Sequence, residues 1–407
     1  MSKENYTQLG GVHPETAAMT NVLANQGFVS PHNGRPLSEP MVLGIAGGLG
    51  CGYILWEFKK YDAAILVMGF QNKWNYTTEF MQNFCNRVGV KTEFLETGGA
   101  KTAARHLDEA LGDGRFPIAW VDQEKLPYFH LRPMYEGCFG HFVTVFGQEN
   151  GHYLLDDRSQ KPLTVDGESL SQARGRIGSY KNRLLLLESN GTEFDLPAAI
   201  MAGLEDCVDY LSQSSQTFAL PVYKKWAKMM TDTKNKKGWP VVFKEKAGLY
   251  STLRSLHEGI KLFGTAGGGL RGFYADFLQE AEEILNQSTL GEAAEQYRHV
   301  SDLWRDFADA VLPDEIAPLK ETKALLAQKY SLFLARGTEA DDKLRQLSQQ
   351  LQDMEVELNG SFGGLRTSRF PINNDTMHAL FTDMQGHLEH IYAAEKQALA
   401  ALAGAIS

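Results

Sequence analysis

Hydrophobic and polar residues follow two different spacings along the chain, one typical of helices and one typical of strands. Apolar residues recur three and four positions apart over residues 15–26, 77–88 and 102–111, which predicts three helices. Short apolar runs predict strands at residues 63–70, 90–95, 117–121 and 183–188. Gly27 and Gly89 each follow a helical stretch, as is common at helix ends. Helices that precede most of the strands favour an α+β fold with a largely antiparallel sheet.

The clearest local pattern is a β-hairpin over residues 140–158. Apolar residues fill both strands, and residues 148–151 supply a turn rich in residues that tolerate positive φ. His141 stands at the start of the first strand, and Asp156 and Asp157 follow the second. A histidine with an aspartate one hairpin away is the base and orienter of a Cys–His–Asp type site, although a structural core histidine is the alternative. Because side chains alternate along a strand, only one aspartate can reach the imidazole.

Helical patterning dominates the second half of the chain. Apolar residues at spacings of three and four predict helices over residues 280–290, 291–311, 321–335, 341–358 and 374–403. Residues 189–192, with the sequence Ser-Asn-Gly-Thr, have the composition of a linker. The sequence therefore predicts a first domain over residues 1–190 and a helical bundle over residues 191–407. This bundle is either a cap with no chemistry of its own or part of the functional protein, and its long last helix favours a homodimer.

Composition narrows the class of protein. The chain has 407 residues, of which 43% are hydrophobic and 22% charged, as in ordinary globular proteins. A net charge of −10 argues against nucleic-acid binding. No apolar run reaches the roughly 18–20 residues that span a bilayer, and no signal-peptide core follows the first methionine. We expect a cytoplasmic protein that does not bind membranes.

Cysteine and glycine spacing gives no sign of a metal or cofactor. The four cysteines, Cys51, Cys85, Cys138 and Cys207, form no C-x-x-C pair, so we expect free buried thiols. The glycine runs at residues 47–48 and 267–269 lack the lysine or the βαβ context of a phosphate-binding loop. We therefore expect neither a metal nor a cofactor.

Several motifs occur in a recognisable order. In the first half these are His13 to Leu23 with Gly27, Ser38 to Met41 with the glycine-rich residues 43–50, Asp122 with Leu126-Pro127-Tyr128, Gly140 to Val143, and Asp157-Arg158-Ser159. In this order they resemble the butirosin biosynthesis protein H family, a branch of the papain-like (C39-like) cysteine-peptidase fold. In the second half, Gly264 to Gly269 with Arg271, Tyr274, Phe277 and Leu278 resembles the helical domain of unknown function that usually follows. The resemblance spans nearly the whole chain.

One position departs from the family pattern. In the family, a cysteine directly follows the histidine that opens the first helix, where the helix N-terminus and the imidazole favour a thiolate. Here that position is Pro14. Proline suits the first turn of a helix, so the helix start is kept while the nucleophile is lost.

The resemblance implies roles for the hairpin residues and the cysteines. His141 would be the general base and Asp157 its orienter, because Asp157 precedes Arg158-Ser159 as in the family. Asp156 would then be a solvated neighbour. Cys51 or Cys138 could replace the missing nucleophile, but neither lies at a predicted helix start, so inert thiols are the alternative.

Six further residues could border a substrate cleft, namely His13, Glu15, Thr16, Glu39, Asp122 and Tyr128. Each has a structural alternative. Thr16 could cap the first helix, Glu15 could complement its dipole, and Glu39 could open a second helix before Pro40.

One basic stretch stands out in an acidic chain. Between Tyr223 and Lys246 the sequence contains the lysines Lys224, Lys225, Lys228, Lys234, Lys236, Lys237, Lys244 and Lys246. They form either a solvated surface or a docking site for an acidic acyl carrier protein, with Trp226 and Trp239 as apolar anchors.

Three functions remain open. The resemblance favours an acyltransferase or cyclase of specialised metabolism that acts on a carrier-protein-bound thioester or a small-molecule acyl substrate, with His141 as base. The missing cysteine suggests instead a catalytically silent binding or scaffold protein with a papain-like cleft. A displaced thiol would make the chain a cysteine hydrolase.

Overall fold

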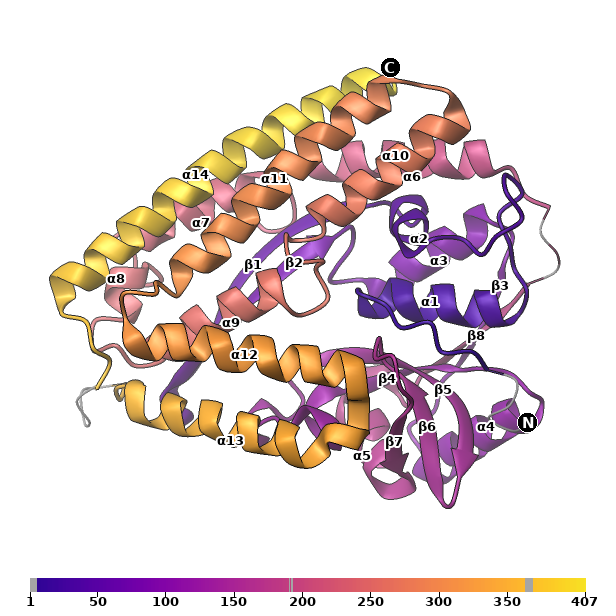
Figure 1. Cartoon of the computed structure of the whole chain (residues 1–407), viewed down its shortest axis with the longest axis horizontal. Helices are drawn as coiled ribbons and strands as arrows, with labels where there is room; N and C mark the ends of the chain where they lie inside the picture. The colour runs from indigo at the N-terminus through magenta and orange to yellow at the C-terminus, as the bar shows by residue number, and fades with distance from the viewer. Residues whose placement is uncertain (1–5, 190, 192, 363–368) are drawn as a thin grey trace. The chain divides into compact units, whose positions relative to one another are not determined.

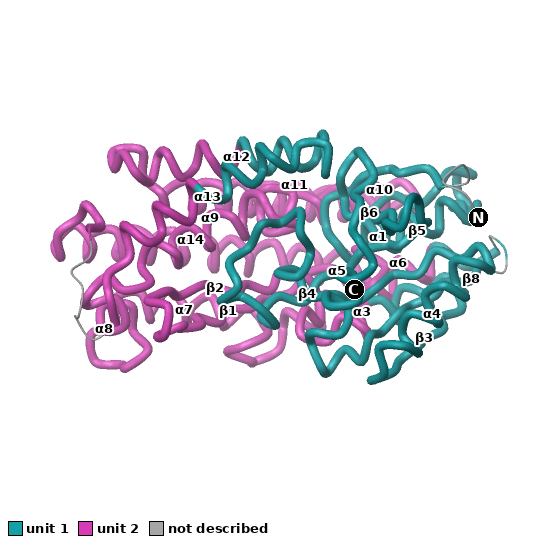
Figure 2. Tube along the Cα trace, turned by 90° about the horizontal axis from the view of Figure 1, so that it is seen from below, with its two compact units in different colours: residues 1–42, 81–196, 328–349 teal, residues 43–80, 197–327, 350–407 magenta. Residues whose placement is uncertain are grey.

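The chain folds into two compact units, each made of separate segments of sequence. In the computed structural model, residues 6–189, 191, 193–362 and 369–407 are described. Unit 1 contains residues 1–42, 81–196 and 328–349, and unit 2 contains residues 43–80, 197–327 and 350–407 (Figure 2). Both units therefore draw on sequence from either side of residue 190. Within the expected linker, Asn190 and Thr192 lie outside the described residues.

Unit 1 is built on a six-stranded antiparallel sheet. Its spatial order is β3 (Lys91–Leu95), β8 (Leu184–Glu188), β4 (Ile118–Asp122), β5 (Gly140–Glu149), β6 (His152–Asp156) and β7 (Leu163–Asp166). The predicted hairpin is confirmed as β5 and β6. Its turn residues Asn150 and Gly151 both have positive φ, 51° and 79°, as a tight two-residue hairpin turn requires. The strand β8 lies inside the sheet between β3 and β4, far from its neighbours in sequence.

Two helices pack on this sheet near its centre. The helix α1 (Pro14–Asn25) contacts β5, and α5 (Gly167–Arg176) contacts β4. Both α1 and α4 (Ala100–Gly112) agree with the predicted helices to within two residues. Short 3-10 turns complete the connections at η3 (Gln123–Lys125), η4 (Pro127–Phe129), η5 (Pro133–Tyr135), η6 (Gly178–Tyr180) and η7 (Gly337–Ala340).

Unit 2 combines one hairpin with a helical bundle. The hairpin pairs β1 (Leu49–Phe58) with β2 (Ala63–Gln71), linked by η2 (Lys59–Tyr61). Its helices are α6 (Leu196–Leu211), α7 (Pro221–Thr231), α8 (Trp239–Val242), α9 (Leu249–Lys261), α10 (Arg271–Leu285), α11 (Thr289–Val311) and α14 (Asn374–Ala405). The helices α11 and α14 run side by side (Figure 1). The sequence boundaries between the units also fall within the helices α2 (Glu39–Ile45), α3 (Thr77–Arg87), α12 (Ala317–Arg336) and α13 (Asp341–Leu358).

One detail of the helical half differs from expectation. A single helix over residues 280–290 is wrong, because α10 begins at Arg271 and ends at Leu285. Asn286 then adopts a left-handed conformation with φ 52°, which stops the helix before α11 begins. The α+β first region with an antiparallel sheet and the largely helical second region are otherwise confirmed.

The glycine-rich segment of the first half packs inside unit 2. A Cβ at Gly44 would lie 2.3 Å from the Phe277 ring, and one at Gly48 would lie 2.5 Å from the Tyr274 ring. Both aromatic residues lie on α10, so these glycines permit close contact between helix and backbone. Among the described residues, no helix is long and apolar enough to cross a membrane.

Candidate functional site

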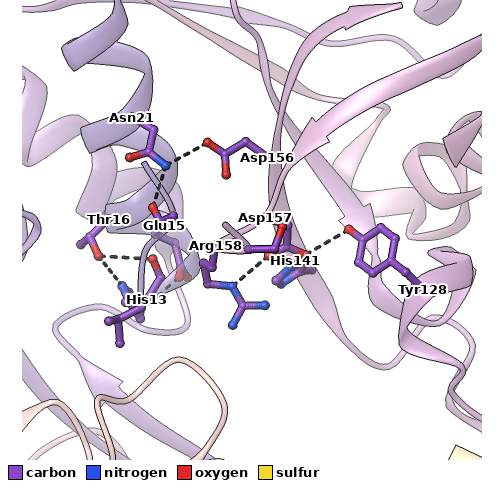
Figure 3. Close-up of polar contacts among 12 residues, drawn as sticks. His13, Glu15, Thr16, Asn21, Tyr128, His141, Asp156, Asp157 and Arg158 are labelled. Atoms are coloured by element: carbon purple, nitrogen blue, oxygen red, sulfur yellow. Dashed lines mark hydrogen bonds and ion pairs between the residues drawn. The ribbon is translucent and has the colours of Figure 1, made fainter. Parts of the chain in front are cut away.

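His141 and Asp157 form a tightly bonded, buried pair in unit 1. The Nε2 atom of His141, at the start of β5, lies 2.7 Å from Oδ2 of Asp157, which follows β6. The hydroxyl of Tyr128 donates to the same Oδ2 at 3.0 Å, and Nε of Arg158 donates to Oδ1 at 2.8 Å (Figure 3). Three donors therefore fix the carboxylate, and the carboxylate fixes the orientation of the imidazole.

The charges around Asp157 keep it ionised. Burial alone would favour the neutral acid, but the positive charge of Arg158 and the bond to His141 outweigh it and hold the pKa of Asp157 well below its usual range. The His141 ring also meets the Phe129 ring edge to face, with centroids 5.3 Å apart. Only 2% of His141 is exposed, so the imidazole is almost fully covered by protein.

Asp156 is not the solvated neighbour that strand alternation suggested. It does point away from His141, toward α1, as Figure 3 shows, but it is 4% exposed. Its Oδ2 accepts from the Tyr6 hydroxyl at 2.7 Å and from Nδ2 of Asn21 at 2.9 Å. Burial raises the pKa of Asp156 from 3.8 to about 6, against the opposing effect of these two hydrogen bonds. The two neighbouring aspartates thus have opposite electrostatic environments.

The start of α1 holds four of the predicted site residues together. The Glu39 carboxylate accepts from the backbone N–H of His13 at 2.8 Å and from the Thr16 hydroxyl at 2.8 Å. The His13 ring lies 3.1 Å from Thr16 through Nδ1 and 3.1 Å from Glu15 through Nε2. Burial raises the pKa of Glu39, and its hydrogen bonds to the amides and the Thr16 hydroxyl oppose that rise.

This second cluster closes the helix N-terminus. Glu39 supplies a negative charge to the amides that precede α1, and Pro14 occupies the first helical position without an N–H of its own. The helix start predicted from the sequence is therefore present, and a side chain from outside the helix accepts from the two amides that directly precede it.

A small cavity, too narrow to admit a water molecule, lies between α1 and the hairpin. Its lining residues are Pro14, Ala17, Ala18, Asn21, Phe142, Asp156, Asp157 and Arg158. The cavity thus touches the position of the missing cysteine and both aspartates of the hairpin. His141 itself does not belong to the lining.

Two other predicted residues have different roles. Asp122 is buried and accepts from the backbone N–H of Gly137 at 2.7 Å, so it organises the loop that follows β4. Burial raises the pKa of Asp122, and the hydrogen bond from Gly137 opposes that rise. Tyr128, by contrast, joins the His141–Asp157 pair directly.

Neither candidate cysteine has the environment of a nucleophile. Cys51 lies in unit 2 and is buried beside Arg271, and burial raises the pKa of its thiol to about 12. Cys138 is partly buried in unit 1, where burial and the charge of Asp122 raise its pKa. A reactive thiolate needs a lowered pKa. Within the described part of the chain, no group of three or more His, Cys, Asp or Glu residues could hold a metal ion.

The lysine-rich stretch is exposed, but its tryptophans are not. Lys224, Lys225 and Lys228 lie on one face of α7 and are solvent-exposed. Trp226 and Trp239 are fully buried in unit 2, so the expectation that they anchor a partner is wrong. Their apolar surface serves the core of the bundle.

Sequence patterns missed several residues that complete the site. Tyr6 and Asn21 bind Asp156 from positions about 150 and 135 residues away, and no local pattern signals such contacts. A late segment of the chain also covers the site, since Phe333 stacks on Phe129 with centroids 5.7 Å apart and Lys329 donates to the Phe129 carbonyl at 3.0 Å. The motif Asp157-Arg158 was the only local hint of the Arg158 contact.

Comparison with known families agrees with the order of motifs. The model for the butirosin biosynthesis protein H N-terminal domain matches residues 13–158, and that for a domain of unknown function (DUF4872) matches residues 168–319. A comparison with curated proteins gives no match. The first match contains the α1 start, Tyr128 and the His141–Asp157 pair, and ends at Arg158. The chain therefore contains a butirosin biosynthesis protein H N-terminal domain followed by this domain of unknown function.

Proposed function

We propose that this protein catalyses acyl transfer or cyclisation in the biosynthesis of a specialised metabolite, using a thioester bound to a carrier protein as acyl donor. The observation that carries the proposal is the buried His141–Asp157 pair, held by Tyr128 and Arg158, beside a helix start without a thiol. The family match adds the association with antibiotic biosynthesis that its name carries.

The chemistry does not need a covalent acyl-enzyme. A thioester is already activated, so a base that deprotonates the attacking nucleophile is sufficient for transfer, and such catalysis contributes on the order of 10²–10⁴-fold. We assign this role to His141, with Asp157 stabilising the imidazolium that forms. The nucleophile bonds to the acyl carbon, the carbon–sulfur bond breaks, and the imidazolium returns the proton to the leaving thiolate.

We assign stabilisation of the oxyanion to the backbone amides in the first turn of α1. The amides of Val12 and His13 already donate to Glu39, and Pro14 has no N–H. The next amides, of Glu15 and Thr16, belong to the helix N-terminus, where the dipole favours negative charge. Together with the antiparallel sheet on which α1 packs, this arrangement supports a papain-like fold for the first region.

The exposed lysines of α7 support docking of an acidic carrier protein. Lys224, Lys225 and Lys228 concentrate positive charge on one helix of a chain whose net charge is −10. Complementary charge raises the rate of encounter and sets specificity more than it adds affinity. We infer that the region between Lys224 and Lys246 receives the carrier protein.

A silent binding protein is the second candidate. Two observations favour it, namely Pro14 at the usual nucleophile position and the 2% exposure of His141. Such a protein would keep the helix start and the hairpin for recognition and would turn over no substrate.

An assay with small thioesters separates the two candidates. The protein is incubated with straight-chain acyl N-acetylcysteamine thioesters and a primary amine, and amide formation is followed by mass spectrometry. His141→Ala should lower the rate at least 100-fold while His152→Ala, an exposed histidine of the same hairpin, leaves it unchanged. No turnover by the unmodified protein with any thioester, or equal rates for His141→Ala, would favour the silent protein.

Carrier docking is tested by charge reversal. The triple variant K224E/K225E/K228E should bind a holo acyl carrier protein about tenfold more weakly at low salt, measured by fluorescence anisotropy. The variant K59E/K60E reverses two other exposed lysines of unit 2 and should bind normally. Equal loss in both variants would indicate a general effect of net charge and contradict docking at α7.

A further inference from the structure

The His141–Asp157 pair lies under a segment from a distant part of the chain. Residues 328–349, which we call the cover segment, comprise the end of α12, the turn η7 and the start of α13, and they belong to unit 1 (Figure 2). This segment lies beyond residue 319, where the second family match ends. It therefore adds to the site from outside both matched domains.

The cover segment holds the turn η4, which packs against the pair. Phe333 stacks on Tyr128 and Phe129, the last two residues of η4, with ring centroids 5.9 and 5.7 Å apart. Lys329 donates to the Phe129 carbonyl at 3.0 Å. The same two residues of η4 contact the pair, one through a hydrogen bond to the carboxylate and the other through its ring. The cover segment thus reaches the pair through η4.

The turn η4 ends in a conformation that the cover segment helps to hold. His130, which follows η4, has φ 50°, a left-handed conformation that costs free energy in a residue other than glycine. Its Nε2 lies 2.9 Å from Oδ1 of Asp341, the first residue of α13. A residue in such a conformation keeps it only while its surroundings fix it. Departure of Asp341 would therefore favour a rearrangement of η4.

The cover segment also contacts the chain that follows Asp157. The backbone N–H of Gln160 donates to the Leu334 carbonyl at 2.7 Å. The hydroxyls of Thr164 on β7 and Thr338 on η7 lie 3.3 Å apart, and this pair is exposed. Exposed polar contacts of this kind open at a lower free energy than the paired strands of a sheet core.

We propose that the cover segment is a lid that controls access to His141. In the closed state it presses η4 onto the pair. On opening it releases η4 and exposes the imidazole, while the six-stranded sheet stays folded. This inference rests on the proposed function, in which a substrate must meet His141. It explains how a base for a reaction between two molecules can be only 2% exposed in the closed chain.

Chemical modification of histidines tests the lid without any acyl transfer. Diethyl pyrocarbonate modifies accessible imidazoles, and mass spectrometry gives a rate for each histidine of the full chain. The rate at His141 reports opening of the lid. The rate at His13, which is 6% exposed at the start of α1, reports unfolding of unit 1 as a whole. The rate at His152, an exposed residue, reports the reactivity of the reagent.

A disulfide at the surface can hold the lid closed. The variant T164C/T338C puts two thiols side by side on β7 and η7, and their oxidation joins the cover segment to the sheet. Modification of His141 should then become at least about tenfold slower than in T164S/T338S, which cannot form the bond. The rates at His13 and His152 should be equal in the two proteins.

Removal of the ring that holds η4 should open the lid. Phe333→Ala should make modification of His141 at least about tenfold faster and leave the rate at His13 unchanged. Phe194→Ala is the matched control, because Phe194 also stacks on a phenylalanine of unit 1, Phe28, but lies outside the cover segment. It should leave the rate at His141 unchanged. Circular dichroism confirms that each variant is folded.

The outcomes separate this inference from the proposed function. Equal rates at His141 in T164S/T338S and oxidised T164C/T338C overturn the lid, and so does an equal rise at His141 and His13 in Phe333→Ala. Labelling of His141 that follows the lock in a protein without acyl transfer supports the lid and contradicts the proposed function. Acyl transfer at the same rate in the locked and unlocked proteins overturns the lid and leaves the proposed function standing.

Discussion

Replacement of Asp156 by asparagine should stabilise unit 1 at neutral pH. In the folded protein, burial raises the pKa of Asp156 from 3.8 to about 6, so ionisation is harder in the folded than in the unfolded chain. A raised carboxylate pKa contributes stability that is fully present below the unfolded value and is lost as the pH rises through the folded value. Asparagine has no such charge to bury, and its side-chain oxygen can still accept from Tyr6 and Asn21.

The size of the gain in unfolding free energy follows from the shift in the pKa of Asp156. A difference of about 2 units corresponds to about 3 kcal/mol of unfolding free energy once the pH is well above 6. About half of this develops between pH 5 and pH 8, because at pH 5 the unfolded carboxyl is already ionised while the folded one is not. The asparagine variant should therefore gain about 1–2 kcal/mol on the natural protein over that range.

Urea unfolding measures the difference in unfolding free energy between the variant and the natural protein directly. The free energy of unfolding of both proteins is determined at pH 5, 6, 7 and 8, with tryptophan fluorescence and circular dichroism compared for a common transition. Asp108→Asn is the control, because it makes the same chemical change in an exposed aspartate that also accepts from a tyrosine, Tyr153. A variant curve parallel to that of the natural protein at all four values would refute the reasoning about Asp156.

Two further predictions concern charge and thiols. Asp157→Ala should lower the unfolding free energy by about 3–5 kcal/mol at pH 7, because it leaves the buried Arg158 without its carboxylate; a loss below about 1 kcal/mol in urea would contradict the pairing. Iodoacetamide should label Cys138 first in the folded protein, because Cys51 and Cys207 are buried and their pKa values are raised to about 12 and about 11. Rapid labelling of Cys51, mapped by mass spectrometry and coupled to loss of acyl transfer, would revive the displaced-thiol mechanism.

Local sequence patterns predicted much of the fold because helix ends and tight turns are encoded locally. The end of α1 before Gly27 and the turn at Asn150 and Gly151 need only backbone conformations that neighbouring residues favour. The strand β1 was missed because its glycine-rich start looks like a loop, and only its pairing with β2 gives it strand geometry. Pairing between strands produces no local periodicity in the sequence from which β1 could be predicted.

Only part of the candidate site could be predicted, because contacts between distant segments leave no local pattern in the sequence. Strand alternation placed Asp156 and Asp157 on opposite faces, but it did not show which face is covered. Tyr6 and Asn21 cover Asp156, and Phe333 covers Phe129, whose ring meets that of His141. Burial by distant segments raises the pKa of Asp156, whereas Arg158 and His141 keep Asp157 ionised against its burial, and a single sequence contains no direct measure of these contacts.

The position of β8 inside the sheet determines how much of the chain is needed to form the sheet that holds His141 and Asp157. The strand joins β3 to β4 through antiparallel pairing on both of its sides, yet it lies beyond residue 158, where the first family match ends. A fragment cut there would leave β3 without a partner and would open one side of β4, and the loss of β7 would open one side of β6, so these bare strand edges would be free to recruit other copies. The matched segment is thus shorter than the sheet that carries the hairpin with His141, which needs residues as far as Glu188 to have all six strands.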